Sequence, residues 1–157
     1  MNSTTKTPNV NIDFDKPFGL YAKLAYVQNN IPTLTKSATA KVATKTGGKF
    51  EYKYITLDQI LEELLPLCQA VGLAVYQRPV GGELETVVTD VDSPSDQISC
   101  KLPLIGANGS MQNYGAAITY ARRYSLGCIF QIATEEDDDA GSISLKKRAR
   151  QQEKPPQ

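Results

Sequence analysis

Three segments in the middle of the chain alternate apolar and polar side chains, and only short turns separate them. These segments span residues 73–80, 84–91 and 97–105. Alternation of this kind is typical of strands that bury one face and leave the other face in water. Gly81-Gly82 in the first gap and Ser93-Pro-Ser95 in the second favour tight turns, which join antiparallel strands. The chain is therefore predicted to form an antiparallel β-meander that needs a second layer over one face.

The segment after the meander supplies that layer, since residues 112–126 have the spacing of a helix. At about 100° per residue, one narrow stripe of this helix carries Tyr114, Ala117, Ile118, Ala121 and Ser125. Small side chains let a helix approach a sheet closely, so we expect this stripe to lie on the meander. Arg123 would then point away from the sheet into solvent, with Arg122 beside the stripe. Gly127 is expected to cap the helix, and residues 128–132 to form a short closing strand.

Two further helices are predicted before the meander. The first begins with Asp15 as its cap and ends before Pro32, which disfavours helical geometry at the preceding residue. The second begins with a capping box formed by Thr56 and Gln59 and ends at Gly72. Its predicted buried stripe consists of Leu57, Ile60, Leu61, Leu64, Leu65 and Cys68.

A basic hairpin is predicted between these two helices. Residues 38–45 and 49–54 have strand composition and flank Gly47-Gly48, which favours a turn. The second strand separates its side chains by type, with Phe50, Tyr52 and Tyr54 on one face and Lys49, Glu51 and Lys53 on the other. We expect the aromatic face to enter the core and the charged face to lie in water, where its lysines can meet phosphates.

The chain is thus predicted to be an α+β protein in which an antiparallel β-meander packs on helices, with a β-β-β-α core, an N-terminal helix and a basic hairpin. Its 157 residues suffice for one domain with a real core, which we place at residues 15–133. Residues 1–14 are expected to be a flexible N-terminus, and residues 134–157 an acidic block with a flexible basic tail. No apolar run reaches the roughly 20 residues of a membrane span, and the polar N-terminus lacks a signal-peptide core. We therefore expect a cytoplasmic protein with no membrane partner.

Charge is balanced overall but segregated along the chain. The sequence has 17 basic and 17 acidic side chains, for a formal net charge of zero. Residues 135–139 are all acidic, whereas residues 146–154 are mostly basic. Residues 36–53 carry five lysines against Glu51 as the one acidic side chain. Because segregation of this kind matters more than the total, the hairpin is a candidate surface for a polyanion.

The composition also excludes several kinds of chemistry. Histidine is absent, which removes the commonest general base and the commonest metal ligand, so a Ser-His-Asp triad and a Cys/His zinc site cannot form. Thr46-Gly-Gly-Lys-Phe50 resembles only a fragment of a P-loop, because the first glycine and the Ser/Thr after the lysine are missing. We expect no metal, no cofactor and no enzymatic activity. The cysteines at positions 68, 100 and 128 form no CxxC pair and are interpreted as small buried hydrophobes.

The helix predicted at 112–126 combines three tyrosines with two adjacent arginines. Side chains of these two types suit a partner with phosphates and flat rings, which indicates nucleic acid. Periodicity alone leaves a second interpretation open, in which a solvated arginine pair lies beside tyrosines that bridge core and surface.

Five motifs follow one another in an informative order. They are Lys53-Tyr-Ile-Thr-Leu-Asp-Gln-Ile-Leu61, Leu65-Pro-Leu67, Val71-Gly-Leu-Ala-Val75, Tyr114-Gly-Ala-Ala-Ile-Thr-Tyr-Ala-Arg-Arg-Tyr124 and Asp137-Asp-Asp139. At these intervals they closely resemble the ERF (essential recombination function) family of phage and prophage single-strand annealing proteins, over about residues 15–141. The resemblance implies ATP-independent binding of single-stranded DNA, annealing of complementary strands, assembly into homo-oligomeric rings or helical filaments, and a β-β-β-α core shared with other annealing proteins. It leaves open whether a phage nuclease or host recombination proteins are partners.

We therefore expect two clusters to converge on one groove that holds single-stranded DNA. The residues are Lys41, Lys45, Lys49 and Lys53 on the hairpin, with Tyr120, Arg122 and Arg123 on the helix. The cationic side chains would hold phosphates in a sequence-independent and salt-sensitive way, and Tyr120 would stack on a base.

Two alternative functions remain open. One is a metal-dependent nuclease that uses Asp137, Asp138 and Asp139 with Glu135, although carboxylates of a single stretch converge poorly on a two-metal site. The other is a protein-binding adaptor whose arginines bind acidic partners. The acidic block itself has three interpretations, namely a solvated linker, a divalent-metal site and an electrostatic mimic of DNA.

Overall fold

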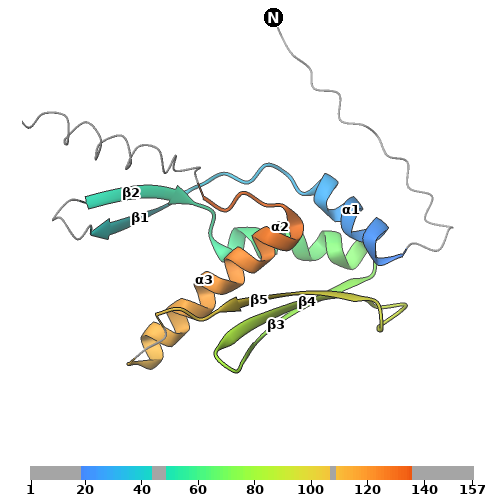
Figure 1. Cartoon of the computed structure of the whole chain (residues 1–157). Coiled ribbons are helices and arrows are strands. Elements are labelled where there is room, and N and C mark those ends of the chain that lie inside the picture. The colour runs from blue at the N-terminus through green and yellow to red at the C-terminus, as the bar shows by residue number, and fades with distance from the viewer. Residues whose placement is uncertain (1–18, 44–48, 107–108, 136–157) are drawn as a thin grey trace, which may run out of the picture.

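The computed structural model describes residues 19–43, 49–106 and 109–135. Within these ranges the chain forms three helices and five strands (Figure 1). In chain order they are α1 (Leu20–Asn30), β1 (Ala38–Ala43), β2 (Lys49–Tyr54), α2 (Leu57–Ala70), β3 (Leu73–Val80), β4 (Glu83–Asp90), β5 (Gln97–Pro103) and α3 (Met111–Phe130). This mixture of helices and antiparallel strands confirms the predicted α+β class. The predicted cap at Asp15 and the predicted turn at Gly47-Gly48 lie outside the described residues.

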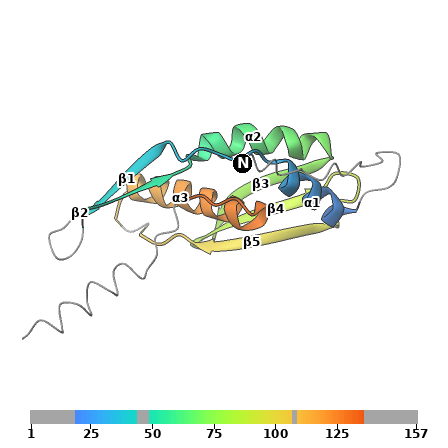
Figure 2. The same cartoon turned by 90° about the horizontal axis from the view of Figure 1, so that it is seen from above.

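Strands β3, β4 and β5 form the predicted antiparallel meander, in that order across the sheet. All three helices lie on the same face of this sheet, with α3 crossing it obliquely (Figures 1 and 2). The opposite face carries charged side chains, because Glu85 on β4 pairs with Arg78 at 2.8 Å and with Lys101 at 3.6 Å. The side chains that point toward the helices form the core.

The main core lies between the sheet and the helices. Its most deeply buried side chains are Val27, Ile55, Ile60, Leu64, Cys68, Val88, Leu126 and Phe130. A second cluster of Leu84, Leu104 and Ala121 lies between α3 and the sheet. Leu65 was predicted to join the buried stripe of α2, but it is 44% exposed. The physical reason is its position, about 90° around the helix from the centre of that stripe.

Both ends of α2 follow the sequence prediction. Thr56 Oγ1 accepts a hydrogen bond from Gln59 N at 3.3 Å, and Gln59 Oε1 accepts one from Thr56 N at 3.0 Å, which completes the capping box. Gly72 follows the helix with a φ of 72°, a left-handed conformation that glycine adopts without strain. The end of α1 is also confirmed, since the backbone of Ile31 is extended directly before Pro32.

A buried ion pair joins α1 to the sheet. Lys23 is 5% exposed, and its Nζ donates to Asp90 Oδ1 at 2.7 Å and to Asp92 Oδ2 at 2.9 Å. Asp90 ends β4 and is 2% exposed. Burial alone would lower the pKa of Lys23, but the hydrogen bonds and charges of the two aspartates outweigh burial and raise it. Lys23 therefore stays charged inside the protein and holds α1 against the end of β4.

The helix α3 extends beyond its predicted end. The predicted cap at Gly127 and the predicted closing strand at 128–132 are wrong, since the helix continues through Gly127 to Phe130 and Gln131 caps it with a φ of 58°. Gly127 is needed for a different reason. A Cβ at this position would lie 2.8 Å from Thr134 Cγ2 and 3.0 Å from Ile132 O, because the chain folds back over the helix here.

Strands β1 and β2 form a separate antiparallel hairpin that projects from the body beside α3 (Figures 1 and 2). At its base, Ile55 N donates to Thr134 O at 2.9 Å. Directly beside this contact, Tyr54 makes an isolated antiparallel bridge with Glu135. The residues that follow α3 therefore attach the hairpin to the body.

Candidate nucleic-acid interface

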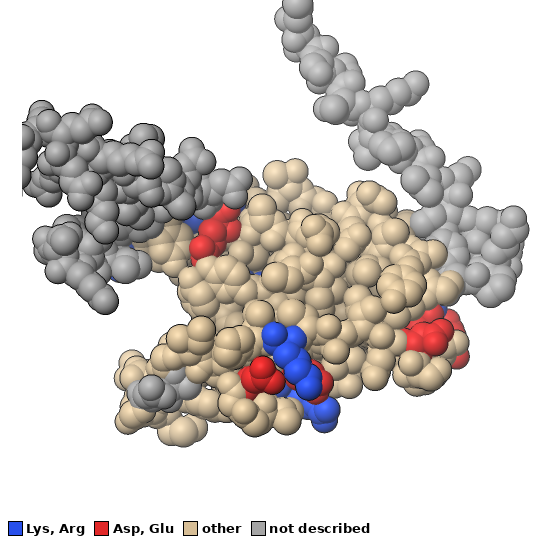
Figure 3. All heavy atoms as spheres, viewed as in Figure 1, with Lys and Arg blue, Asp and Glu red and all other residues tan. Residues whose placement is uncertain are grey.

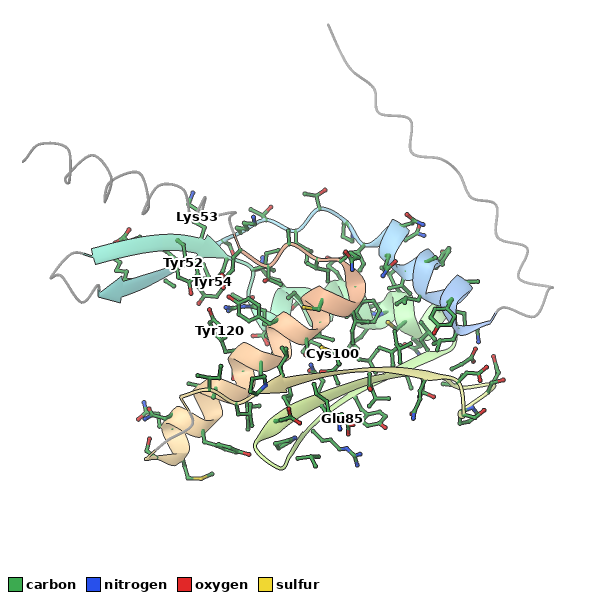
Figure 4. The ribbon with its side chains drawn as sticks, in the orientation of Figure 1. Tyr52, Lys53, Tyr54, Glu85, Cys100 and Tyr120 are labelled. Atoms are coloured by element: carbon green, nitrogen blue, oxygen red, sulfur yellow. The ribbon has the colours of Figure 1, made fainter. Side chains whose placement is uncertain are left out.

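Four tyrosines and one arginine meet where the hairpin approaches α3. Tyr52 and Tyr54 come from β2, whereas Tyr120, Arg123 and Tyr124 come from α3, and we call this group the tyrosine–arginine cluster. Figure 4 shows Tyr52 and Tyr54 on the side of the hairpin that faces Tyr120. The ring centroids of Tyr120 and Tyr124 are 4.5 Å apart, and those of Tyr52 and Tyr54 are 6.1 Å apart. The aromatic face of β2 thus packs against α3, where both of its tyrosines are half-buried.

Arg123 lies at the centre of this cluster. Its Cζ is 4.4 Å from the ring centroid of Tyr54, 4.8 Å from that of Tyr120 and 5.4 Å from that of Tyr124. Arg123 is only 6% exposed, so the prediction that it points into solvent is wrong. It does point away from the sheet. The hairpin and the residues after α3 cover that side of the helix, however, and the periodicity of α3 alone cannot reveal this cover.

Glu135 supplies the negative charge that Arg123 needs in this buried position. Its Oε1 accepts hydrogen bonds from Arg123 Nη2 at 3.1 Å, from Tyr120 OH at 3.4 Å and from Tyr124 OH. The Glu135 side chain is 26% exposed, whereas that of Arg123 is 7% exposed. Although Glu135 opens the acidic block of the sequence, it belongs to the folded body. Residues 136–139 of that block lie outside the described residues.

The hydroxyl groups of Tyr52, Tyr120 and Tyr124 are held in their protonated form. A hydrogen bond with Tyr120, together with burial, raises the pKa of Tyr52 to about 12. Burial is the main cause that raises the pKa of Tyr120 and of Tyr124, and the hydrogen bond to Glu135 raises that of Tyr124 further. At neutral pH these hydroxyls therefore keep their protons and can donate hydrogen bonds to an anionic oxygen.

An open and mostly apolar groove of about 700 Å³ runs between α3 and the end of β5. Its walls include Leu102, Pro103 and Ile105 on one side and Ala117, Tyr120 and Tyr124 on the other. Tyr120 is 47% exposed, so part of its ring faces the opening. On the face drawn in Figure 3, the surface around this part of α3 and the end of β5 carries almost no charged side chains. Apolar walls with an aromatic rim suit the flat faces of a ligand such as a nucleobase.

One cysteine also lines this groove. Cys128 is exposed, so its interpretation as a small buried hydrophobe is wrong. Cys68 is buried in the main core, where burial raises the pKa of its thiol to about 12, and Cys100 is half-buried. The pattern around Cys128 did not reveal its exposure because the residue was assigned to a strand rather than to the outer side of α3.

Arg122 lies on the other side of α3, next to β3. Its Nε donates to Gln77 Oε1 at 2.9 Å. Gln77 Nε2 in turn donates to Thr86 Oγ1 at 2.9 Å and to Ser125 Oγ at 3.0 Å, both of which are fully buried. A polar network at the contact between helix and sheet thus holds the guanidinium. Within the described ranges no carboxylate pairs with Arg122, which leaves its terminal nitrogens available to a phosphate.

The hairpin lysines that the structure describes lie on the face opposite to the tyrosine–arginine cluster. Lys53 points away from the side of the hairpin that carries Tyr52 and Tyr54 (Figure 4). Lys41 stands opposite Glu51 in the register, and their side chains pair at 3.0 Å. Lys45 lies outside the described residues, and of Lys49 only the backbone is described.

The prediction that both clusters converge on a single groove is wrong for this geometry. Neighbouring residues of a strand point to opposite faces, so Lys53 cannot face Arg123 when Tyr54 does. Arg122 is bonded to β3, across α3 from the hairpin. On the face drawn in Figure 3, the described lysines and arginines occur in small groups beside acidic side chains and form no continuous basic patch.

Metal-ligating side chains do not gather in the part of the chain that the structure describes. No group of three or more His, Cys, Asp or Glu side chains is placed there to hold a metal ion. Asp137, Asp138 and Asp139, the residues of the nuclease hypothesis, lie outside that part. None of the described helices is long and apolar enough to cross a membrane.

Comparison with known protein families decides the relationship that the motifs suggested. The family model described as "ERF superfamily" matches residues 20–157, which is most of the chain. The chain belongs to the ERF superfamily. No curated protein and no solved structure matches it. Membership in the ERF superfamily confirms the resemblance and links the chain to phage-type DNA recombination.

Two residues that shape the site of this ERF-superfamily chain were missed in the sequence. Gln77 is a polar side chain in the row of β3 that faces the helices, and its place in that otherwise apolar row is a signal that the sequence does contain. Glu135 was hidden because four more acidic residues follow it. No local pattern distinguishes the carboxylate of Glu135, which bonds to Arg123 and Tyr124 of α3.

Proposed function

We propose that this chain binds single-stranded DNA and anneals complementary strands without ATP in phage-type homologous recombination. Membership in the ERF superfamily supports the recombination role. The observation that carries the DNA-binding role is the half-exposed ring of Tyr120 at the rim of an apolar groove. Aromatic rings beside such grooves bind successive bases by stacking, with little preference for sequence.

The candidate residues other than Arg123 have three kinds of role in this proposal. Tyr120 stacks on one base, and the groove beside it receives the apolar surface of a neighbouring nucleotide. Lys41 and Lys53 bind phosphates of nucleotides that pass over the outer face of the hairpin, and Lys45 and Lys49 are assigned the same role from the sequence. Arg122 binds a phosphate where the strand crosses α3. The cationic contacts are therefore distributed along the strand rather than gathered in one trough.

This arrangement suits annealing because it leaves the hydrogen-bonding edges of the bases free. Stacking uses the face of a base, and lysine contacts use the phosphates, so neither blocks Watson–Crick pairing. Annealing changes no covalent bond and requires no catalytic residue. One protomer of this size covers only a few nucleotides, so neighbouring protomers would extend the binding surface in a ring or filament. We place this activity in the bacterial host cell, with a phage nuclease or host recombination proteins as candidate partners.

The direct test is an annealing assay with labelled complementary oligonucleotides, Mg²⁺ and no ATP. We expect duplex formation to be faster with the protein than without it, and both strands to keep their full length on a denaturing gel. Shortened strands would support the nuclease hypothesis instead. Mass measurement of the protein with and without DNA then shows whether several protomers assemble on a strand. Failure of the protein to bind any oligonucleotide would refute the proposal.

Substitution of Tyr120 by alanine is expected to weaken binding of single-stranded DNA about tenfold, because a stacked base loses its platform. Tyr120→Phe keeps the ring and should bind within about threefold of the wild type. Fluorescence anisotropy with a labelled oligonucleotide measures both affinities. Tyr21→Ala is the matched control, since Tyr21 is a 73% exposed tyrosine on α1, away from the groove. Equal losses from Tyr120→Ala and Tyr21→Ala would remove Tyr120 from the site.

Substitution of Lys53 by glutamine should make binding less sensitive to salt. Each phosphate contact on a single strand contributes about 0.7 to the slope of log Kd against log salt concentration, and Lys53→Gln should lower the slope by about this amount. Titrations at several salt concentrations measure it. Lys101→Gln removes the same charge from the outer face of the sheet, where Lys101 pairs with Glu85, and should leave the slope unchanged. An unchanged slope for Lys53→Gln would exclude a phosphate contact there.

A further inference from the structure

Three hydrogen-bond donors converge on a single carboxylate oxygen in the tyrosine–arginine cluster. Glu135 Oε1 accepts from Arg123 Nη2 at 3.1 Å, from Tyr120 OH at 3.4 Å and from Tyr124 OH. The two tyrosine hydroxyls are themselves 2.7 Å apart, so all three donors surround one small volume. Arginine and hydroxyl donors around one anionic oxygen are also the groups that bind a phosphate. The cluster is therefore an anion site, and the carboxylate of the chain itself occupies it.

The match between Arg123 and this carboxylate is incomplete. Arg123 Nε is buried and has no hydrogen-bond partner among the residues that the structure describes. Glu135 reaches the guanidinium only through Nη2. A guanidinium presents its donors as a fork that fits two oxygens of a phosphate at once, and a buried donor without a partner is unfavourable. A phosphate could satisfy both Nε and Nη2, which Glu135 does not.

Solvent reaches the carboxylate that occupies the site more easily than it reaches the arginine behind it. The side chain of Glu135 is 26% exposed, whereas that of Arg123 behind it is 7% exposed. Figure 4 shows Tyr120 on the side of α3 that faces the hairpin. Backbone contacts at Ile55 and Tyr54 hold the segment that carries Glu135, so rotation of one side chain suffices to vacate the site.

We propose that Arg123, Tyr120 and Tyr124 form a binding site for a DNA phosphate, and that Glu135 occupies this site in the free protein as an internal competitor. The inference rests on the proposed binding of single-stranded DNA and assigns a regulation to that same surface. A strand that stacks on Tyr120 brings a phosphate next to the cluster. Its phosphate then displaces the carboxylate, and Arg123 becomes a DNA contact only in the complex.

Glu135→Gln tests the competition, because glutamine keeps the size of the side chain and removes its charge. The probe is a labelled single-stranded oligonucleotide of random sequence, and its Kd is measured at several salt concentrations with the full chain. We expect binding about tenfold tighter than wild type, because the phosphate no longer has to displace a charged carboxylate, and a salt slope close to that of wild type, since the phosphate contact forms in both complexes. Glu63→Gln is the control, since it removes one charge from the exposed side of α2, which contributes nothing to the cluster. Thermal unfolding checks that each variant is folded.

Arg123→Lys, made in both backgrounds, identifies the group that gains the contact. In the wild-type background the change should alter DNA affinity little, because the weaker contact of lysine with the phosphate is offset by its weaker contact with Glu135, which the phosphate displaces. In the Glu135→Gln background it should abolish most of the gain, since lysine lacks the fork. If wild type binds DNA but Glu135→Gln binds no tighter, or if Glu63→Gln gains as much, the internal competitor is disproved while DNA binding stands. If neither wild type nor Glu135→Gln binds the oligonucleotide, the proposed function itself fails.

Discussion

Replacement of Lys23 by methionine is expected to lower the free energy of unfolding by about 3–5 kcal/mol, the cost of leaving one member of a buried ion pair alone. Methionine fills a similar volume, so the main loss is the charge that compensates Asp90. Asp90 is 2% exposed, and its Oδ1 accepts from Lys23 Nζ at 2.7 Å. Urea unfolding followed by circular dichroism measures the change. Lys41→Met breaks the exposed pair with Glu51 and should cost far less, because water screens that pair.

The loss caused by Lys23→Met should also depend on pH. Burial alone would raise the pKa of Asp90, but hydrogen bonds from Lys23 and from the backbone of Asp92 outweigh burial and hold it below its ordinary value. The folded pKa therefore lies below the unfolded value of about 3.9, and the stability that the carboxylate contributes is present above that pH and is lost in more acidic solution. In the variant, Lys23 no longer lowers the pKa of Asp90, so burial raises this pKa and the folded protein accommodates the protonated carboxyl group. The difference in the free energy of unfolding between wild type and variant should narrow as the pH falls toward about 4, the unfolded pKa. A difference that stays constant with pH would contradict this account.

The second large effect is expected at Gly127, where alanine should lower the free energy of unfolding by roughly 1–3 kcal/mol through overpacking. An added Cβ would lie 2.8 Å from Thr134 Cγ2 and 3.0 Å from Ile132 O. Thr134 is 7% exposed and Ile132 presents backbone, so neither group can move aside easily. The same urea titration measures the loss.

Gly115 provides the matched control in the same helix. A Cβ added there meets nothing within 4 Å, and the residue is exposed. Gly115→Ala should therefore raise the free energy of unfolding by up to about 1 kcal/mol, the ordinary gain of alanine over glycine in a helix. The two substitutions thus have opposite signs. A gain in stability from Gly127→Ala would show that the chain does not pack over α3 at this point.

Much of the fold could be predicted because the rules that specify it are local. Alternation at 73–105 is enough to predict the meander, and the pair Thr56 and Gln59 is enough to predict the start of α2. The end of α3 was not predictable in this way. A glycine near the end of a helix can be a cap or a point of close contact. Only the position of Thr134, where the chain has folded back over α3, shows that Gly127 is a point of close contact.

The candidate site was less predictable for the same physical reason. Helical periodicity predicts that Tyr120 lies beside the sheet-facing stripe of α3. The alternation of a strand predicts that Tyr54 and Lys53 point to opposite faces of β2. Neither period states which element covers the remaining side of α3. Arg123 is buried by Tyr54, far away in the sequence, and by Glu135, so its environment depends on long-range contacts that a pattern within one element cannot contain.

The attachment of the hairpin to the segment after α3 has a consequence for how the chain acquires its structure. The hairpin leaves the ribosome before α3, whereas Thr134 and Glu135, which fix its base, follow α3 in the chain. Lys23 likewise cannot form its ion pair until Asp90, 67 positions later, has been synthesised. Formation of the individual helices is fast, so the slow step of folding should be the closure of these long loops once residue 135 has been synthesised. The nascent chain therefore carries the tyrosines of the tyrosine–arginine cluster in an unassembled form until residue 135 has been synthesised.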